Sequence, residues 1–175
     1  METADTEAVG RVHARAWQAT YADVMPGAFL AAIDPAARAE QWRVTIGRRL
    51  PLHAQLVADV DGVPVGFAAV GLARNDPQRR GEVYAINVDP DWIGRGVGQP
   101  LFARAVAVLN DFGFSKLVLW VVRENARARR FYERNGWVAD DAEQRVEFGD
   151  ATVVELRYRS PDQTAITPES RKNGE

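Results

Sequence analysis

Apolar residues in the first quarter of the chain recur with the spacing of an α-helix. Over residues 6–24 they fall at every third or fourth position, which predicts one amphipathic helix, and Pro26 then interrupts the pattern. A second helical stretch covers residues 35–44, with Asp34 as its predicted N-cap and Pro35 in the first helical position, where its missing N–H has no intrahelical partner. The chain therefore begins with a predicted pair of helices joined by a short apolar segment.

The middle of the chain changes to the patterns of β-strands. Residues 54–60 and 63–70 predict two strands, and the dipeptide Asp61-Gly62 between them is typical of a two-residue hairpin turn. Residues 82–88 predict a third strand, which ends at Asp89-Pro90. We therefore expect three successive strands here.

Helical and strand patterns alternate in the second half. The predicted elements are a helix over 96–112, a strand over 116–122, a helix over 126–135 that stops at Gly136, and a hairpin of strands over 143–148 and 152–158. The run at 116–122 is continuously apolar, as in a strand buried on both faces. The order of elements predicts a mixed α/β sheet in one domain. Residues 160–175 are polar without an apolar period, which predicts a disordered tail.

Composition and charge narrow the class of protein. Of the 175 residues, 46% are hydrophobic and no run is long enough to span a membrane. The net charge of -2 gives no electrostatic footprint for nucleic acid. The first residues are acidic and lack the basic and apolar regions of a secretory signal. With no cysteine and only two histidines, neither a cysteine nucleophile nor a metal site is expected. These features predict a cytoplasmic protein without a membrane or nucleic-acid partner.

A glycine-rich turn is the first candidate for chemistry. Ile93-Gly94-Arg95-Gly96-Val97-Gly98 lies between a predicted strand and a predicted helix. Glycines allow positive φ and a close approach of a ligand to the backbone, while the helix N-terminus directs unpaired N–H groups at one point, which suits a phosphate. The glycines are spaced by two, so neither the dinucleotide-binding pattern nor the lysine-bearing phosphate loop is present. On this turn alone, tight packing and phosphate binding are equally open.

Two motifs together resemble the GCN5-related N-acetyltransferase superfamily. Residues 93–98 are similar to its Gln/Arg-x-x-Gly-x-Gly/Ala motif, although Ile93 replaces the first polar residue. Residues 125–137 resemble its Asn-x-x-Ala-x-x-x-Tyr-x-x-x-Gly-Phe motif. The pair Trp17 and Tyr21 and the closing segment 155–158 are also similar to bacterial members. The resemblance covers roughly residues 6–159.

The resemblance implies a fold and a domain boundary. It implies an α/β fold with a mixed, mostly antiparallel central sheet, splayed parallel strands and flanking helices. Residues 1–159 would form the N-acetyltransferase domain, followed by the disordered tail 160–175. The family usually opens with a strand before its first helix, and only a handful of residues precede that helix here. We therefore expect the first strand to be shortened or missing.

The implied activity is transfer of an acetyl group from acetyl-CoA to a primary amine of a small molecule or peptide, by direct attack in a ternary complex and without a metal. Because Ile93 cannot hold phosphate, that role falls on Arg95 and on the backbone of residues 95–99. The residues expected to bind acetyl-CoA are Ile86, Asn87, Val88, Gly94, Arg95, Gly96, Val97, Gly98, Gln99, Asn125 and Tyr132. A backbone amide of the strand ending at residues 86–88 would stabilise the developing oxyanion.

Tyr132 is the candidate general acid. Asn125 precedes it by two helical turns, so both side chains can face the cofactor from one side of a helix. A phenol is protonated at neutral pH and can give its proton to the departing thiolate. The alternative is that Tyr132 simply packs beside Phe131. Arg127, Arg129 and Arg130 on the same helix resemble a solvated face, although one of them could meet the 3′-phosphate of the nucleotide.

Glu82 is the candidate general base. It lies four residues before Ile86 on one predicted strand, so a period of two places both side chains on one face. The histone-modifying branch of the family is similar, with a strand glutamate as its base. An exposed carboxylate at the end of the strand is an equally supported alternative. The family places its substrate near the first two helices, which makes Trp17, Tyr21 and Trp42 candidates for the acceptor site, although aromatic residues at helical spacing are more often part of a core.

Two questions stay open at the level of sequence. A non-catalytic acyl-CoA-binding or regulatory module with the same fold is the alternative to an enzyme, and fold alone does not decide between them. The acceptor could be an antibiotic, a polyamine, an amino acid or a protein N-terminus. A homodimer is compatible with the sequence, which does not indicate an oligomeric state.

Overall fold

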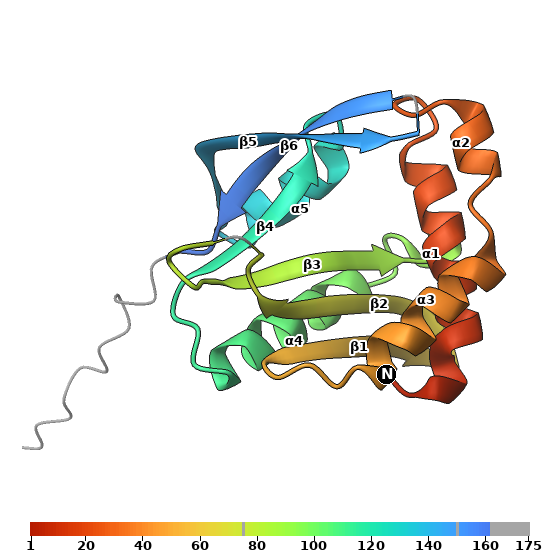
Figure 1. Cartoon of the computed structure of the whole chain (residues 1–175), viewed down its shortest axis with the longest axis horizontal. Helices are drawn as coiled ribbons and strands as arrows, with labels where there is room; N and C mark the ends of the chain where they lie inside the picture. The colour runs from red at the N-terminus through yellow and green to blue at the C-terminus, as the bar shows by residue number, and fades with distance from the viewer. Residues whose placement is uncertain (75, 150, 162–175) are drawn as a thin grey trace, which may run out of the picture.

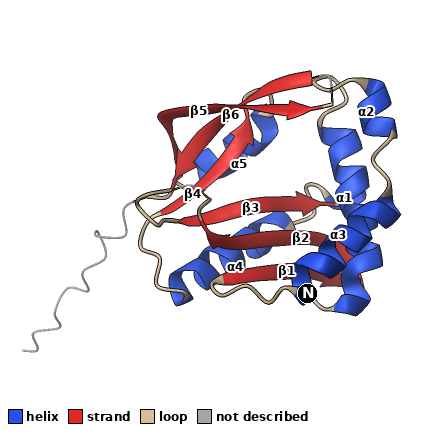
Figure 2. Cartoon of the chain, in the orientation of Figure 1, coloured by secondary structure: helices blue, strands red, loops and turns tan. Residues whose placement is uncertain are grey.

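The computed structural model describes residues 1–74, 76–149 and 151–161, whose strands form one sheet (Figures 1 and 2). The strands are β1 (His53–Val60), β2 (Val63–Leu72), β3 (Gly81–Val88), β4 (Leu117–Val122), β5 (Val138–Phe148) and β6 (Ala151–Arg159). Their order across the sheet is β1-β2-β3-β4-β6-β5. Every neighbouring pair is antiparallel except β3 and β4, which are parallel. The predicted mixed, mostly antiparallel α/β sheet is confirmed.

Helices cover both faces of the sheet (Figure 1). They are α1 (Thr6–Thr20), α2 (Gly27–Ala31), α3 (Pro35–Gly47), α4 (Gly98–Asp111) and α5 (Ala126–Arg134), with short 3-10 helices at Thr3–Asp5 and Pro90–Trp92. Strand β2 shows how the core is divided. Phe67 packs in a cluster with Val9 of α1 and Trp42 of α3, whereas Ala68 belongs to the cluster that contains Phe102 of α4. Because successive residues of a strand point to opposite faces, α1 and α3 cover one face and α4 the other.

The ends of the chain refine the sequence predictions. Within the described residues no strand precedes α1, because the chain enters this helix through the 3-10 helix Thr3–Asp5, so the expected first strand is missing. At the other end, Ser160 is buried, and its hydroxyl accepts a hydrogen bond of 3.2 Å from the backbone N–H of Leu117. Ordered packing therefore extends beyond residue 159, while residues 162–175 of the predicted tail lie outside the described residues.

The parallel strands separate soon after they meet. The ladder between β3 and β4 covers only Gly81–Val83 opposite Leu117–Leu119. Beyond these residues β3 stays paired with β2, and β4 stays paired with β6. Figure 1 shows the two strands diverging toward α1. The splayed parallel strands expected from the family resemblance are therefore present.

A half-buried histidine lies in the contact between α1, α3 and the sheet. The Nδ1 atom of His13 accepts a hydrogen bond of 3.2 Å from the indole N–H of Trp42, and its ring lies 5.3 Å from that of Phe67. Burial, and secondarily the charge of Arg38, lowers the pKa of His13 to about 4. The imidazole is therefore neutral in the folded protein at neutral pH.

This histidine predicts a loss of stability in mild acid. Unfolded His13 binds a proton near pH 6.5, whereas the folded form binds one only near pH 4. Well above pH 6.5, His13 is neutral in both states and does not make the free energy of unfolding depend on pH. Between pH 6.5 and pH 4 the unfolded state binds more protons than the folded state. The free energy of unfolding should therefore fall by up to about 3 kcal/mol between pH 6.5 and pH 4. Urea denaturation at several pH values measures this fall, and His13→Leu should flatten it between pH 6.5 and 5. An equal slope in the variant would contradict the assignment.

Candidate active site

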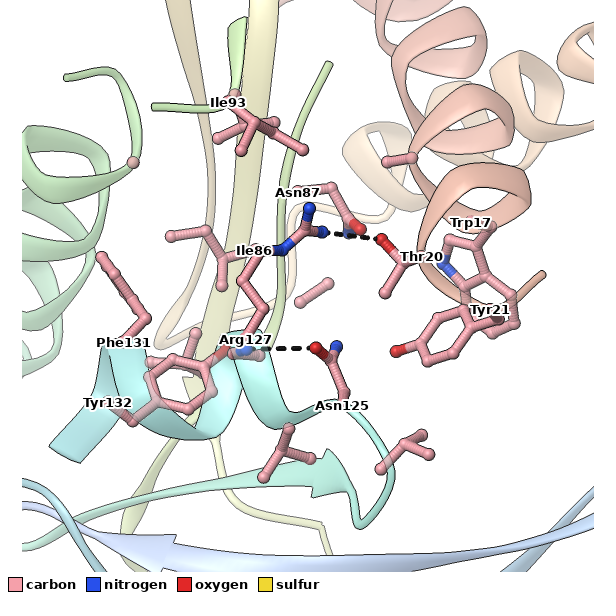
Figure 3. Close-up of a pocket in the computed structure, with 18 of the residues that line it drawn as sticks. Trp17, Thr20, Tyr21, Ile86, Asn87, Ile93, Asn125, Arg127, Phe131 and Tyr132 are labelled. Carbon is pink, nitrogen blue, oxygen red and sulfur yellow. Dashed lines mark hydrogen bonds between the residues drawn. The ribbon is translucent and has the colours of Figure 1, made fainter. Parts of the chain in front are cut away.

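A cleft of about 600 Å³ opens where β3 and β4 separate (Figure 3). One wall comes from β3 and the glycine-rich turn that follows it, and the opposite wall comes from α5 and from the end of β4. Helix α1 contributes Trp17, Thr20 and Tyr21 at one end, and Glu155 of β6 completes the lining. The cleft thus brings together elements from both halves of the sheet.

The glycine-rich turn has the backbone geometry that its sequence predicts. Gly94 and Gly96 have φ values of 79° and 84°, which favour glycine, and α4 begins at Gly98. The side chain of Gln99, which also lines the cleft, donates a hydrogen bond of 2.7 Å to Asn135. The first residues of α4 therefore present their N–H groups at the edge of the cleft, where an anion would be stabilised.

Arg95 and Val97 are placed differently from the other residues of the turn. Gly94, Gly96 and Gly98 are among the residues that line the cleft, whereas Arg95 and Val97 are not. The guanidinium of Arg95 lies 5.4 Å from the ring centroid of Trp92, in a cation–π contact. The side chain that sequence analysis assigned to the phosphate thus contacts an aromatic ring of the 3-10 helix in this structure.

Helix α5 brings its two motif residues to the same cleft. Asn125 is the N-cap, and its Oδ1 accepts a hydrogen bond of 3.1 Å from the N–H of Ala128. Tyr132, two turns later, also lines the cleft and is 7% exposed. Both residues therefore line the same cleft, and their contact with a cofactor stays a prediction. The ring centroid of Tyr132 also lies 5.5 Å from those of Phe102 and Phe131. Tyr132 therefore packs in the core and lines the cleft at the same time.

The hydroxyl of Tyr132 is held in its protonated form. Burial raises the pKa of Tyr132 far above its ordinary value, and the nearby phenol of Tyr21 raises this pKa further. The hydroxyl of Tyr132 therefore keeps its proton throughout the neutral pH range. This is the state that a proton donor requires.

The aromatic pair of α1 faces α5 across the cleft (Figure 3). The ring centroid of Trp17 lies 5.2 Å from those of both Tyr21 and Phe148, so Trp17 belongs to the core between α1 and β5 as well as to the cleft lining. Trp42 is not among the lining residues and packs on Phe67 in the core, so its assignment to the acceptor site was wrong. The pKa of Tyr21 is raised, first by burial. Asn125 and Arg127 lower it, and Glu155 raises it. The Tyr21 phenol is therefore near charged groups from two other elements.

The strand wall of the cleft contains the three residues of β3 that were expected to bind acetyl-CoA. Ile86, Asn87 and Val88 all line the cleft. They pair with Ala68, Phe67 and Gly66 of β2 through one edge of β3. In the described structure the ladder to β4 ends at Val83, so the other edge of β3 is left for a ligand at these residues. An extended chain can hydrogen-bond to such an edge as an added strand does.

Glu82 does not lie on the same face as Ile86, and this prediction was wrong. Between β2 and β3 the pairing passes from Ala69↔Ala85 to Val70↔Val83, so Tyr84 is an extra residue in a β-bulge. Because the bulge shifts the alternation, Val83 and Ile86 both pack on the cluster that contains α4. Glu82, adjacent to Val83, points to the opposite face.

The carboxylate of Glu82 is engaged inside the protein. It is 2% exposed, so the alternative of an exposed strand-end carboxylate is also wrong. Its oxygens accept hydrogen bonds of 3.1 Å from the backbone N–H and 3.0 Å from the guanidinium of Arg74. Glu82 is not among the residues that line the cleft, and its role as the base stays a prediction.

Replacing the carboxylate of Glu82 by an amide tests its contribution to stability and its predicted role as the general base separately. We expect Glu82→Gln to lower the free energy of unfolding by roughly 1–3 kcal/mol, because a charged acceptor of two hydrogen bonds is replaced by a neutral one. Chemical denaturation measures this loss. The matched change Glu143→Gln removes an exposed carboxylate that pairs with Arg123, and it should have almost no effect. Turnover of the folded Glu82→Gln protein tests the base assignment directly, and an unchanged value would contradict it.

Two charged residues of the cleft were not identified from the sequence, and a third was left open there. Arg127 was expected on a solvated face or at the 3′-phosphate of the nucleotide. Its side chain is exposed and lines the cleft, and its Nη2 donates a hydrogen bond of 3.0 Å to the Thr20 hydroxyl, so it joins α5 to α1 (Figure 3). Arg134 and Glu155 also line the cleft. The sequence contained a signal for the two arginines, because Arg127, Phe131 and Arg134 recur at helical spacing, and all three line the cleft.

Neither a metal centre nor a membrane-spanning helix is present in the described residues. The described part of the chain contains no group of three or more His, Cys, Asp or Glu side chains that could hold a metal ion. None of its helices has the length and apolar character needed to cross a membrane.

Comparison with known proteins identifies the family. Residues 14–137 match the model of the Acetyltransferase (GNAT) family, which is well over half of the chain. The chain belongs to this family. The matched segment runs from α1 to the end of the second motif, so it includes the glycine-rich turn and Tyr132. The resemblance found in the sequence is thereby confirmed.

Curated acetyltransferases and a solved structure resemble this chain. The chain is 36% identical over 87 residues to a mycothiol acetyltransferase of Propionibacterium freudenreichii, a match that covers 50% of this chain and 28% of that protein. It is 28% identical over 123 residues to an uncharacterized N-acetyltransferase of Bacillus subtilis, covering 69% and 68% of the two chains. The PaiA N-acetyltransferase of Thermoplasma acidophilum, solved in complex with coenzyme A, superimposes with a TM-score of 0.72 at 21% identity, over 90% and 94% of the two chains. This last likeness shows that the GNAT fold is shared.

Proposed function

We propose that this GNAT protein transfers the acetyl group of acetyl-CoA to a primary amine of a small molecule or peptide, by direct attack in a ternary complex. The observation that carries the proposal is the cleft between β3 and β4. Its lining includes the glycine-rich turn, the residues of β3 whose edge β4 leaves unpaired, and Tyr132. A turn suited to phosphate, a strand edge suited to an extended chain and a protonated phenol in one cleft support the proposal.

The phosphates of acetyl-CoA would bind at the glycine-rich turn. Gly94 and Gly96 provide the turn, and the N-terminus of α4 at Gly98 provides unpaired N–H groups and the positive end of a helix dipole. The side chain of Ile93 is apolar and 39% exposed, so the backbone carries this role. Arg134 lines the cleft from the last turn of α5 and supplies a cation for the phosphates.

The pantetheine arm would lie along β3. Backbone groups of residues 86–88 on the free edge can pair with its amides, as β-strands pair with an extended chain. A backbone N–H on this edge would then be close to the thioester oxygen and could stabilise negative charge there. The thioester supplies an activated acetyl group, and the chain orients it between β3 and α5.

The reaction needs a proton donor for the departing thiolate. The amine nitrogen forms a bond to the acetyl carbon, the carbon–sulfur bond breaks, the nitrogen loses a proton, and the sulfur gains one. Tyr132 would supply the proton to sulfur, because its buried hydroxyl is protonated and its side chain lines the cleft. Asn125, at the start of the same helix, would help to hold the pantetheine arm.

Ligand-dependent stability tests the proposal and its alternative. Acetyl-CoA and CoA should raise the thermal midpoint, since a ligand at 100 times its Kd stabilises a protein by about 2.7 kcal/mol. Stabilisation by NAD or ATP but not by CoA would contradict the proposal. A panel of amines, followed by release of CoA, then separates an enzyme from a non-catalytic acyl-CoA-binding module. Binding without release for any amine would favour the module.

A further inference from the structure

Glu155 faces the α1 side of the cleft from the middle of three strands. On β6 it pairs with Val122 of β4 and with Gln144 of β5. Val122 packs in the cluster that contains Ala14 of α1 and Leu30 of α2, so this face of the sheet is directed toward α1. Since directly paired residues share a face, the Glu155 carboxylate is directed toward α1 as well, away from α5 on the other face.

The carboxylate of Glu155 forms no ion pair among the residues that the structure describes. Glu155 is the only acidic residue among the described residues that line the cleft. Within the part of the chain that the structure describes, Asp140 and Glu143 on β5 each form an ion pair with an arginine, whereas Glu155 forms none. Its Oε2 accepts a hydrogen bond of 2.7 Å from the Gln144 side chain, and the side chain is only half-buried. A cation entering the cleft therefore meets an available carboxylate.

Aromatic rings form the rest of this end of the cleft. Trp17 of α1 and Tyr21, the C-cap of this helix, lie on one side. Trp120 of β4 lies on the other and shares the face of Glu155, and the guanidinium of Arg157 lies 5.7 Å from its ring centroid, so an acceptor would use the part of this ring that Arg157 leaves uncovered. The raised pKa of Tyr21 is caused in part by the charge of Glu155, so the carboxylate is close to this phenol. Arg127 also acts on Tyr21, but its guanidinium donates to Thr20. Aromatic faces and a carboxylate together suit an organic ammonium ion.

We propose that Glu155 binds the ammonium group of the acceptor as it enters the cleft, and that the acceptor is a cationic amine whose body packs between Trp17, Tyr21 and Trp120. The bound ammonium then loses one proton to water, because only the neutral amine has the lone pair that attacks the thioester. The inference rests on the proposed acetyl transfer and deepens it, because it assigns the acceptor to the α1 side of the cleft. Acetyl-CoA would enter along α4 and α5, from the other side. The two substrates would then meet where β3 and β4 diverge.

Coenzyme A derivatives with a tethered ammonium test this assignment without knowledge of the natural acceptor. The probes are S-(ω-aminoalkyl)-CoA with two, three or four methylene groups, and the neutral S-alkyl-CoA of equal length. Calorimetry gives Kd for each. We expect the best ammonium probe to bind wild-type protein about 10-fold more tightly than its neutral counterpart, the size of a charge-assisted hydrogen bond. Glu155→Gln should abolish this preference and leave the Kd of CoA unchanged.

Two further variants control for indirect effects. Glu143→Gln removes a carboxylate from the adjacent strand, outside the cleft lining, and should keep the full preference for the ammonium probe. Glu155→Lys should reverse the preference, so that the neutral probe binds more tightly. Equal binding of both probes to wild-type protein, or a preference that survives Glu155→Gln, would overturn the assignment. Failure of CoA itself to bind would instead contradict the proposed function.

Discussion

Replacing Tyr132 by phenylalanine should lower kcat at least about 10-fold, the low end being smaller than the usual effect of a general acid. The hydroxyl is the only group removed, and the ring contacts with Phe102 and Phe131 are kept. Because burial raises the pKa of Tyr132, the wild-type hydroxyl stays protonated over the working pH range. The loss should therefore be nearly independent of pH between 6 and about 9. Steady-state CoA release, with saturating acetyl-CoA and an acceptor from the amine panel, measures it.

Tyr158→Phe is the matched control for loss of a tyrosine hydroxyl. Tyr158 is 0% exposed, its hydroxyl donates to Glu133 and accepts from Arg129, and it is not among the residues that line the cleft. Its replacement should reduce stability and leave kcat within a factor of about two. The general-acid assignment fails if Tyr132→Phe turns over as fast as wild type, or if both variants lose the same share of activity.

An aspartate at position 98 should raise the Kd of CoA at least about 100-fold. Gly98 is the first residue of α4, and a Cβ there would lie 3.9 Å from Phe131 and from Val88, which is ordinary contact. A carboxylate in the first turn of a helix favours folding. It would also place a negative charge where the phosphates are expected, and two unit charges 4 Å apart repel by about 4 kcal/mol near a protein surface. Calorimetric titration of Gly98→Asp with CoA measures the effect.

Gly27→Asp is the control for this change. Gly27 is likewise the first residue of a helix, α2, and a Cβ there has no atom within 4 Å. The same charge is thus added at a helix N-terminus outside the cleft lining, so the Kd of CoA should stay within a factor of about two of wild type at 0.15 M salt. Tight CoA binding by Gly98→Asp would show that the phosphates bind elsewhere.

Most of the fold could be predicted because its local signals are strong. The Asp61-Gly62 turn has positive φ at both residues, as expected of the hairpin type that its sequence indicates. Gly136, with a φ of 77°, ends α5 where the pattern placed the stop. Helix α2 was not predicted, because five residues are too few to show helical periodicity. Strand β5 begins at Val138, earlier than expected, because the register with β6 is irregular between Ala139 and Glu143.

The candidate site was less predictable than the fold. Asn125 and Tyr132 could be paired because they lie on one helix, where spacing determines direction. Glu82 was assigned to the wrong face because a β-bulge at Tyr84 shifts the alternation of side chains along β3. No local sequence pattern in this strand predicts the bulge. Glu155 became a candidate only in three dimensions. Its neighbours Tyr21 and Gln144 come from other elements, and its lack of an ion pair among the described residues is a property of the fold.

The short ladder between β3 and β4 has a consequence for the lifetime of the protein. Three residue pairs join the two halves of the sheet, so this seam contributes few of the hydrogen bonds that make unfolding cooperative. A co-substrate bound along the free edge of β3 would add contacts across the seam that the chain itself does not make. Mass action then links the free energy of unfolding to the concentration of acetyl-CoA. Resistance to proteolysis would rise and fall with the acetyl-CoA supply, independently of any change in the sequence.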